Sequence, residues 1–242
     1  YAELMMRLGP DAVAGMAQDM GVSSIADQKV QCSWVLGSGE VSVMDMAAAY
    51  STLANEGIAR TPIVVTRVEF PDGTVRNYEA EEHRVLTPEQ AARVTFALQQ
   101  VIQGGTGREA NFGRPAAGKT GTTQNNADGW FVGYTPTLTA AVWMGFPEGQ
   151  VPMRNVHGMS VQGGNFPARI WNRFMKAATL ASESVDFPEF DEKVLGDGEA
   201  LDATLGRASV LSPPTAPSSS GRPSAATAPS GTPTTGGTAT TD

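Results

Sequence analysis

Residues 117–146 read AGKTGTTQNNADGWFVGYTPTLTAAVWMGF, and this stretch decides the fold. It holds three runs that can form strands, at 117–123, 130–134 and 138–146, and the last two are rich in aromatic and β-branched residues. The turn-forming clusters NNADG and TPT separate the three runs. Short apolar runs joined by tight turns predict an antiparallel meander. The stretch therefore indicates a sheet whose first strand carries Lys119.

The residues after the meander predict a helix that covers it. Between residues 167 and 181, large and small apolar residues recur at spacings of one, three and four, namely Ile170, Trp171, Phe174, Met175 and Ala178. This periodicity gives a helix one apolar face. We therefore expect an α/β (α+β) fold in which helices flank an antiparallel sheet.

Capping residues and turn clusters predict further elements upstream of the meander. They are two helices separated at Gly9-Pro10, the second ending near Gly21; a helix over 46–55, capped by Ser42-x-x-Asp45 and closed by Gly57; a hairpin of 63–70 and 74–78 around Pro71-Asp72-Gly73; and a helix that starts at Thr87, with Gln90 in the capping-box position, and ends at Gly104-Gly105. The turn at 36–42 is expected at the edge of the core.

The first strand of the meander holds the candidate site residues. Lys119 supplies a positive charge, and Thr120 and Thr122 are two residues apart, so their hydroxyls lie on one face of the strand. Gly121 allows a substrate backbone to approach closely. This set suits a peptide that ends in a carboxylate, and the Thr122 N–H can form half of an oxyanion hole. The same residues also occur in ordinary exposed strands, so the motif alone is weak.

Several motifs in a fixed order resemble one protein family. They are Gly118-Lys119-Thr120-Gly121-Thr122-Thr123, the runs at 128–136 and 141–145, the runs at 36–42, 46–50 and 55–57, and Gly163-Gly164 followed by 170–175. Over about residues 1–180 the chain resembles the end of the transpeptidase domain of class A (bifunctional) penicillin-binding proteins. The resemblance implies a partial serine β-lactamase/transpeptidase-like fold.

The resemblance also implies a chemistry and a set of roles. The reaction is acyl transfer from the D-Ala-D-Ala end of a peptidoglycan stem peptide, with β-lactams as mimics of the substrate. Lys119 and Thr122 would be catalytic, and Thr120, Gly121, Thr122 and Thr123 would bind substrate. The family uses no metal and no organic cofactor. Its members face the outside of the bacterial cytoplasmic membrane, where an anchor and a glycosyltransferase domain precede the transpeptidase.

The other two motifs of the family are missing from the sequence. No serine lies three residues before any of the four lysines, so Ser-x-x-Lys is absent, and no serine lies two residues before an asparagine. We expect Ser-x-Asn just upstream of Tyr1 and the nucleophile further upstream. This chain would then be the C-terminal piece of such a protein, and inactive alone.

Two alternatives remain open at this stage. A serine β-lactamase or D,D-carboxypeptidase shares Lys-Thr-Gly, but the Glu-x-x-Leu-Asn setting of class A β-lactamases is absent, and the run from Trp130 to Pro136 favours the transpeptidase. A non-catalytic interaction module of the penicillin-binding type is the second alternative. The presence of Ser-x-x-Lys in preceding sequence would exclude that module.

Composition divides the chain into three segments. Residues 1–181 form the transpeptidase portion, and 182–211 form an acidic linker with eight acids and one lysine between 182 and 206. Residues 212–242 hold Ser, Thr, Pro, Ala and Gly with no large apolar residue, which predicts a disordered tail. The linker accounts for most of the net charge of −8, and no basic cluster suggests nucleic-acid binding.

The remaining special residues predict no further chemistry. The single Cys32, next to Trp34 and Val35, is interpreted as a buried, inert thiol. His83 and His157 are too few and too isolated for a metal site. No stretch of the sequence is long and apolar enough to span a bilayer.

Overall fold

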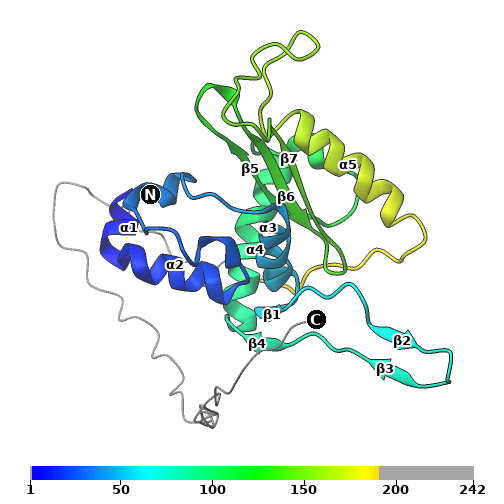
Figure 1. The fold of residues 1–242 in the computed structure, drawn as a ribbon. Coiled ribbons are helices and arrows are strands. Elements are labelled where there is room, and N and C mark those ends of the chain that lie inside the picture. Colours follow the sequence, from blue (N-terminus) through cyan, green and yellow to red (C-terminus); the bar gives the residue numbers. More distant parts are fainter. Residues whose placement is uncertain (1, 191–242) are drawn as a thin grey trace, which may run out of the picture. The chain divides into compact units, whose positions relative to one another are not determined.

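The structure of the protein is a computed structural model that describes residues 2–190. Its centre is a sheet of three antiparallel strands in the order β5-β6-β7 (Figure 1). These strands are β5 (Ala117–Thr122), β6 (Gly129–Tyr134) and β7 (Thr139–Met144), and Thr120 lies opposite Phe131, which in turn lies opposite Val142. The meander that the sequence predicts is therefore confirmed.

Helix α5 (Phe166–Ala178) covers one face of this sheet (Figure 1). The fully buried Trp171 packs edge-on against Phe131, with 5.2 Å between the ring centroids. Its indole N–H donates to the carbonyls of Gly133 and Ala140 at 3.2 and 3.1 Å. The residue at 133 must be small, because a Cβ there would lie 3.0 Å from the Trp171 ring. The apolar periodicity of 167–181 thus predicts this helix correctly.

Helices α3 (Val43–Ala54) and α4 (Pro88–Gln103) pack on the other face. Tyr134 of β6 points toward them, since alternate residues of a strand face opposite sides. It is fully buried, its hydroxyl lies 2.8 Å from the hydroxyl of Thr95, and Tyr50 packs edge-on against its ring. Burial raises the pKa of Tyr134 well above its ordinary value, so the phenol stays neutral.

The predicted helix caps are present. The Ser42 hydroxyl accepts from the Asp45 N–H at the start of α3, and Thr87 and Gln90 form both bonds of a capping box at the start of α4. Helices α1 (Ala2–Leu8) and α2 (Pro10–Asp19) meet at Gly9, as expected. Gly21 has φ 105° and its N–H bonds to the Gln18 carbonyl, which closes α2 as a C-cap glycine does.

The burial predicted for Cys32 is wrong. The short 3-10 helices η1 (Ser23–Ile25) and η2 (Cys32–Leu36) follow α2, and Cys32 is exposed at the start of η2. Its thiol faces the Met6 sulfur at 3.4 Å. Trp34, two residues on, is the residue of this turn that packs inward, against the cluster around Val22 and Ile25. Proximity in sequence to an inward-facing tryptophan was therefore a poor guide to burial.

Four short strands lie between α3 and α4. Strands β2 (Arg67–Glu69) and β3 (Val75–Asn77) form the predicted hairpin, with Gly73 at φ 84° in its turn. Strands β1 (Ile58–Arg60) and β4 (Glu82–Arg84) pair with each other. The sequence did not predict this second pair, because no short turn joins β1 to β4 as Pro71-Asp72-Gly73 joins β2 to β3. The short 3-10 helices η3 (Arg108–Ala110) and η4 (Gln124–Asn126) precede β5 and β6.

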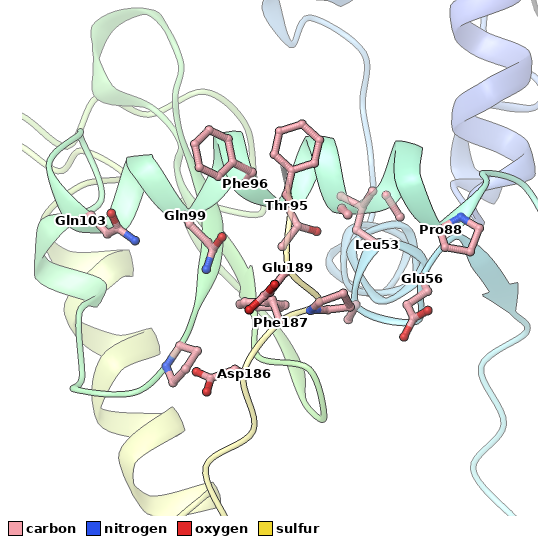
Figure 2. A pocket seen from close by; sticks show the side chains of 16 residues that line it. Leu53, Glu56, Pro88, Thr95, Phe96, Gln99, Gln103, Asp186, Phe187 and Glu189 are labelled. Atoms are coloured by element: carbon pink, nitrogen blue, oxygen red, sulfur yellow. The ribbon is translucent and has the colours of Figure 1, made fainter. Parts of the chain in front are cut away.

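Residues 182–190 run as an extended segment against the body of the domain. Arg114 donates to the carbonyls of Ser182 and Glu183, and the Phe187 ring packs edge-on against Tyr134 with 5.6 Å between centroids. Figure 2 shows Asp186, Phe187 and Glu189 alongside α4, around a cavity of about 390 Å³. This part of the expected acidic linker is therefore attached to the domain. The rest of that linker, 191–211, and the predicted tail, 212–242, lie outside the described residues.

Candidate active site

The outer edge of β5 is the candidate site. Strand β5 pairs with β6 on one side, and no strand of residues 2–190 pairs with its other side. Just beyond the strand, the Thr123 N–H donates to the Asp128 carbonyl across the ladder. Because hydrogen-bonding groups alternate along an antiparallel pair, Thr120 and Thr122 direct their N–H and C=O groups to the outer edge. The Thr122 N–H thus points away from β6, toward the free edge of the strand.

Lys119 delivers a charge to this edge. Its side chain is exposed and lies on the sheet face opposite to the hydroxyls of Thr120 and Thr122. The ammonium curls back to the edge and donates to the Thr120 carbonyl at 2.9 Å. An ammonium keeps three donors, so two remain for a ligand or a neighbouring group. The charge and the outward N–H of Thr122 therefore share one strand edge.

The two threonine hydroxyls lie on the α5 side of the strand, and each has a partner within the chain. The Thr120 hydroxyl lies 2.7 Å from the hydroxyl of Thr106, which follows α4. The Thr122 hydroxyl accepts from the Gly163 N–H at 3.0 Å. The sequence predicted that both hydroxyls share a face, but it did not reveal Thr106 or the role of Gly163. In the sequence these two positions are indicated only by glycine pairs, Gly104-Gly105 just before Thr106 and Gly163-Gly164, and both pairs predict loops and nothing more.

Two glycines, Gly163 and Gly164, let the loop before α5 lie close to β5 at Gly121. A Cβ on Gly163 would lie 2.8 Å from the Gly121 nitrogen and even closer to the Trp130 carbonyl oxygen. A Cβ on Gly164 would likewise collide with the Thr106 carbonyl oxygen. The loop before α5 thus presses backbone against backbone on β5. The close approach of a substrate backbone at Gly121 stays a prediction, since a Cβ on Gly121 itself would have the Trp130 Cβ, at 3.1 Å, as its nearest neighbour.

Thr123 belongs to the turn that ends β5. Its hydroxyl donates to the Asp128 carboxylate at 2.9 Å and accepts from the Asp128 N–H at 2.8 Å. The other carboxylate oxygen accepts from the Trp143 indole at 2.9 Å. These bonds tie the end of β5 to β6 and β7, so the Thr123 hydroxyl supports the strand from behind. Among residues 2–190 no group of three or more His, Cys, Asp or Glu side chains is placed to hold a metal ion.

Comparison with known proteins decides the family. The profile of the penicillin-binding protein transpeptidase domain matches residues 1–159. The chain belongs to this family. It is 34% identical to penicillin-binding protein 1A of Mycolicibacterium smegmatis, over 90% of this chain and 30% of that protein. It is 32% identical to penicillin-binding protein 1A of Mycobacterium tuberculosis, over 78% of this chain and 26% of that protein. The chain therefore spans less than a third of these relatives.

Solved structures agree with this membership. The penicillin-binding protein PonA1 from Mycobacterium tuberculosis superposes with a TM-score of 0.72 at 34% identity, covering 79% of this chain and 56% of that one. PonA1 in complex with penicillin V superposes with a TM-score of 0.71 at 33% identity. The expected fold, a mixed helical and antiparallel structure of the transpeptidase type, is confirmed. In the part of the chain that the structure describes, no helix is both long and apolar enough to cross a membrane.

Proposed function

We propose that this chain forms the Lys-Thr-Gly-Thr wall of a peptidoglycan D,D-transpeptidase at the outer face of the bacterial cytoplasmic membrane. The supporting observation is the free edge of β5, where the Lys119 ammonium and the outward N–H of Thr122 meet within a domain of the penicillin-binding family. The substrate is a stem peptide that ends in D-Ala-D-Ala, and a β-lactam occupies the same place.

Each group on the edge has a role in acyl transfer. A serine oxygen attacks the carbonyl carbon between the two D-Ala residues, forming an ester, and the C–N bond breaks as the departing D-Ala amine takes up a proton. The Thr122 N–H stabilises the oxyanion that forms on the way. Lys119 attracts the terminal carboxylate and assists proton transfer. An amine of a second stem peptide then attacks the ester, forms the cross-link and releases the serine.

The carboxylate of the substrate is held by hydroxyls and backbone of the same strand. Thr120 and Thr122 donate to it, Gly121 keeps the strand surface open to a peptide, and Thr123 fixes the end of the strand through Asp128. The reaction requires a serine nucleophile, and the 242 residues contain no Ser-x-x-Lys. We propose that a longer protein supplies it, together with a membrane anchor and a glycosyltransferase domain.

Labelling with a fluorescent penicillin tests this function. We expect the full-length gene product to form a band that survives denaturing electrophoresis, and the chain of residues 1–242 alone to form none. Consumption of penicillin without a lasting band would identify a β-lactamase instead, and release of D-Ala from a stem peptide without cross-linking would identify a carboxypeptidase. No reaction by the full-length product would identify a non-catalytic module of the same fold, and that outcome would reject the proposal.

A further inference from the structure

Thr106 is outside the Lys-Thr-Gly-Thr motif, yet it touches it. It lies in the loop between α4 and η3, fourteen residues before Thr120, and its hydroxyl is 2.7 Å from the Thr120 hydroxyl. Thr106 is exposed and belongs to none of the core clusters among the described residues. A surface hydroxyl pair adds little to folding free energy, because water can replace either partner. Folding stability therefore does not explain the contact between Thr106 and Thr120.

The hydrogen-bonding of the neighbouring threonine suggests one. The Thr122 hydroxyl accepts from the Gly163 N–H, which can only donate. The accepted bond occupies one lone pair, and the hydroxyl hydrogen of Thr122 remains available to a ligand. If Thr106 donates to Thr120, the Thr120 hydroxyl also accepts one bond from the protein and keeps its hydrogen for a ligand. Both hydroxyls of the strand then accept from the protein and donate outward, as recognition of an anion requires.

We propose that Thr106 is a positioning residue that donates to the Thr120 hydroxyl and thereby directs the hydrogen of Thr120 toward the carboxylate of the ligand. This inference rests on the proposed function and adds a residue to it. Thr106 itself does not touch the ligand. With Thr106 as the donor of this pair, the Thr120 hydroxyl cannot donate its own hydrogen to Thr106.

The loop that carries Thr106 is held firmly enough to do this. The Gly107 N–H donates to the Val101 carbonyl at 2.9 Å, and Arg108 donates to the Gly104 carbonyl from two of its nitrogens. On the other side, Gly164 sits so close to the Thr106 carbonyl that no side chain fits there. The loop that orients Thr122 through Gly163 therefore also braces Thr106. Both hydroxyls are set by one packed junction between the end of α4 and the start of α5.

Acylation kinetics in the full-length protein test the role. Thr106→Val keeps the shape of the side chain and removes its hydroxyl, whereas Thr106→Ser keeps the hydroxyl. Thr137→Val is the matched control, because Thr137 is also exposed and its hydroxyl faces that of Thr135 in the turn between β6 and β7. Penicillin V and its methyl ester serve as probes, since only the first carries the carboxylate. A thermal melt of each variant confirms folding.

For penicillin V, we expect Thr106→Val to lower the second-order acylation rate about ten-fold, as for one misdirected hydrogen bond to a charged group. Thr106→Ser keeps the contact to Thr120, and Thr137→Val removes a hydroxyl in the turn between β6 and β7, so both should stay within about two-fold of wild type. With the methyl ester, Thr106→Val should match wild type. This dependence on the carboxylate separates positioning from a general structural defect.

Three results would overturn the role of Thr106. They are a Thr106→Val variant that acylates like wild type with penicillin V, an equal loss with the ester, and a Thr106→Ser variant as slow as Thr106→Val. Each leaves the proposed function intact, because the wild-type protein still reacts. Failure of the wild-type protein to react with penicillin V would instead reject the proposed function, and the role of Thr106 with it.

Discussion

Lys119 is the residue on which the charge of the site depends. Its ammonium lies on the outer edge of β5 only because the side chain bends back to the Thr120 carbonyl. Arg114 on the same approach to β5 is engaged elsewhere, by the carbonyls of Ser182 and Glu183. Of these two cations, only Lys119 therefore places its charge on the outer edge of β5.

Removal of that charge should slow acylation. We expect Lys119→Ala in the full-length protein to lower the second-order rate of reaction with penicillin V by about 10²–10⁴-fold, the range of a lost acid–base or oxyanion group. Lys176→Ala is the control, since Lys176 is exposed in the last turn of α5. Equal rates for wild type and a folded Lys119→Ala variant would show that β5 is not part of the active site.

The sequence could predict the residues on β5 but not their partners. Alternation along a strand is a local rule, so placing Thr120 and Thr122 on one face needs no tertiary information. The contacts to Thr106 and Gly163 join residues 14 and 41 positions apart, and they depend on how α4 and α5 meet the sheet. Local patterns carry no information on such a junction. The prediction that Cys32 is buried was wrong for a similar reason, because the path of the short helix η2 decides which of its side chains face solvent.

The packing of the loop before α5 against β5 depends on Gly163. A Cβ at Gly163 would lie 2.8 Å from the Gly121 nitrogen, and backbone cannot move aside as a flexible side chain can. We expect Gly163→Ala to lower the free energy of unfolding by about 1–3 kcal/mol, the usual penalty of overpacking, and to weaken penicillin binding through Thr122. Thermal melts and acylation rates of the same variant provide both readouts.

Gly15→Ala is the matched control for this substitution. Gly15 lies inside α2, and a Cβ there would meet no atom within 4 Å. Alanine is the better helix former, so this variant should be more stable than wild type by about 0.5–1 kcal/mol. A Gly163→Ala variant that melts at or above the wild-type temperature would contradict the tight packing of this loop.

A buried carboxylate joins α3 to the short helix η1. Asp45 accepts from the Ser24 N–H at 2.8 Å and from the Ser23 hydroxyl at 3.1 Å. Burial alone would raise the pKa of Asp45, but hydrogen bonds from Ser24, Ser23 and Ser42 outweigh it and leave the pKa below its ordinary value of 3.8. The folded state therefore favours the charged form.

Asp45 should make stability depend on pH in the acid range. Because its folded pKa is lowered, its contribution is complete above the unfolded value of 3.8 and is lost as the pH falls through the folded pKa. We expect Asp45→Asn to cost about 1–3 kcal/mol at neutral pH, because the neutral amide replaces a charged acceptor that two donors share. The difference from wild type should shrink as the pH falls through the folded pKa of Asp45.

Denaturant titrations at several pH values measure this difference. Asp27→Asn serves as the control, since Asp27 is exposed in the same region and makes no hydrogen bond through its side chain among the described residues. That variant should follow the wild-type pH dependence. A difference between wild type and Asp45→Asn that stays constant down to strongly acid pH would rule out the lowered pKa.

At the scale of the whole molecule, the folded region extends past the last predicted helix. Sequence composition placed residues 182–190 in a solvated linker because acids are frequent there. The structure shows that Phe187 and Phe190 instead pack on Tyr134 and Phe96. The prediction was based on the acidic residues and did not weigh Phe187 and Phe190, the two apolar rings that hold this segment against the domain. The helices and the meander, by contrast, followed from periodicity and caps that are visible in short windows.

Loss of the Phe187 ring should loosen this attachment. The ring is half-buried against the buried Tyr134, so we expect Phe187→Ala to cost about 1–2 kcal/mol, less than the 3–5 kcal/mol typical of a fully buried phenylalanine. Leu180→Ala is the control, because Leu180 is 81% exposed and should melt like wild type. A Phe187→Ala variant with an unchanged melting temperature would mean that residues 182–190 do not stabilise the domain.

The isolated chain should be poorly soluble, because its first helices expose apolar side chains. Met6 is 66% exposed, Leu8 59% and Leu36 76%, and both outer edges of the β5-β6-β7 sheet lack a partner strand within residues 2–190. Exposed apolar groups and free edges promote self-association. We expect residues 1–190 alone to bind a hydrophobic dye such as ANS and to aggregate on heating.

Replacing Met6, Leu8 and Leu36 with glutamine should reduce both effects, because the apolar surface would be removed while the sheet edges remain. A soluble monomer of residues 1–190 that melts cooperatively and binds no dye would show that these surfaces need no covering partner, and it would weaken the proposal that the chain is one part of a larger transpeptidase domain.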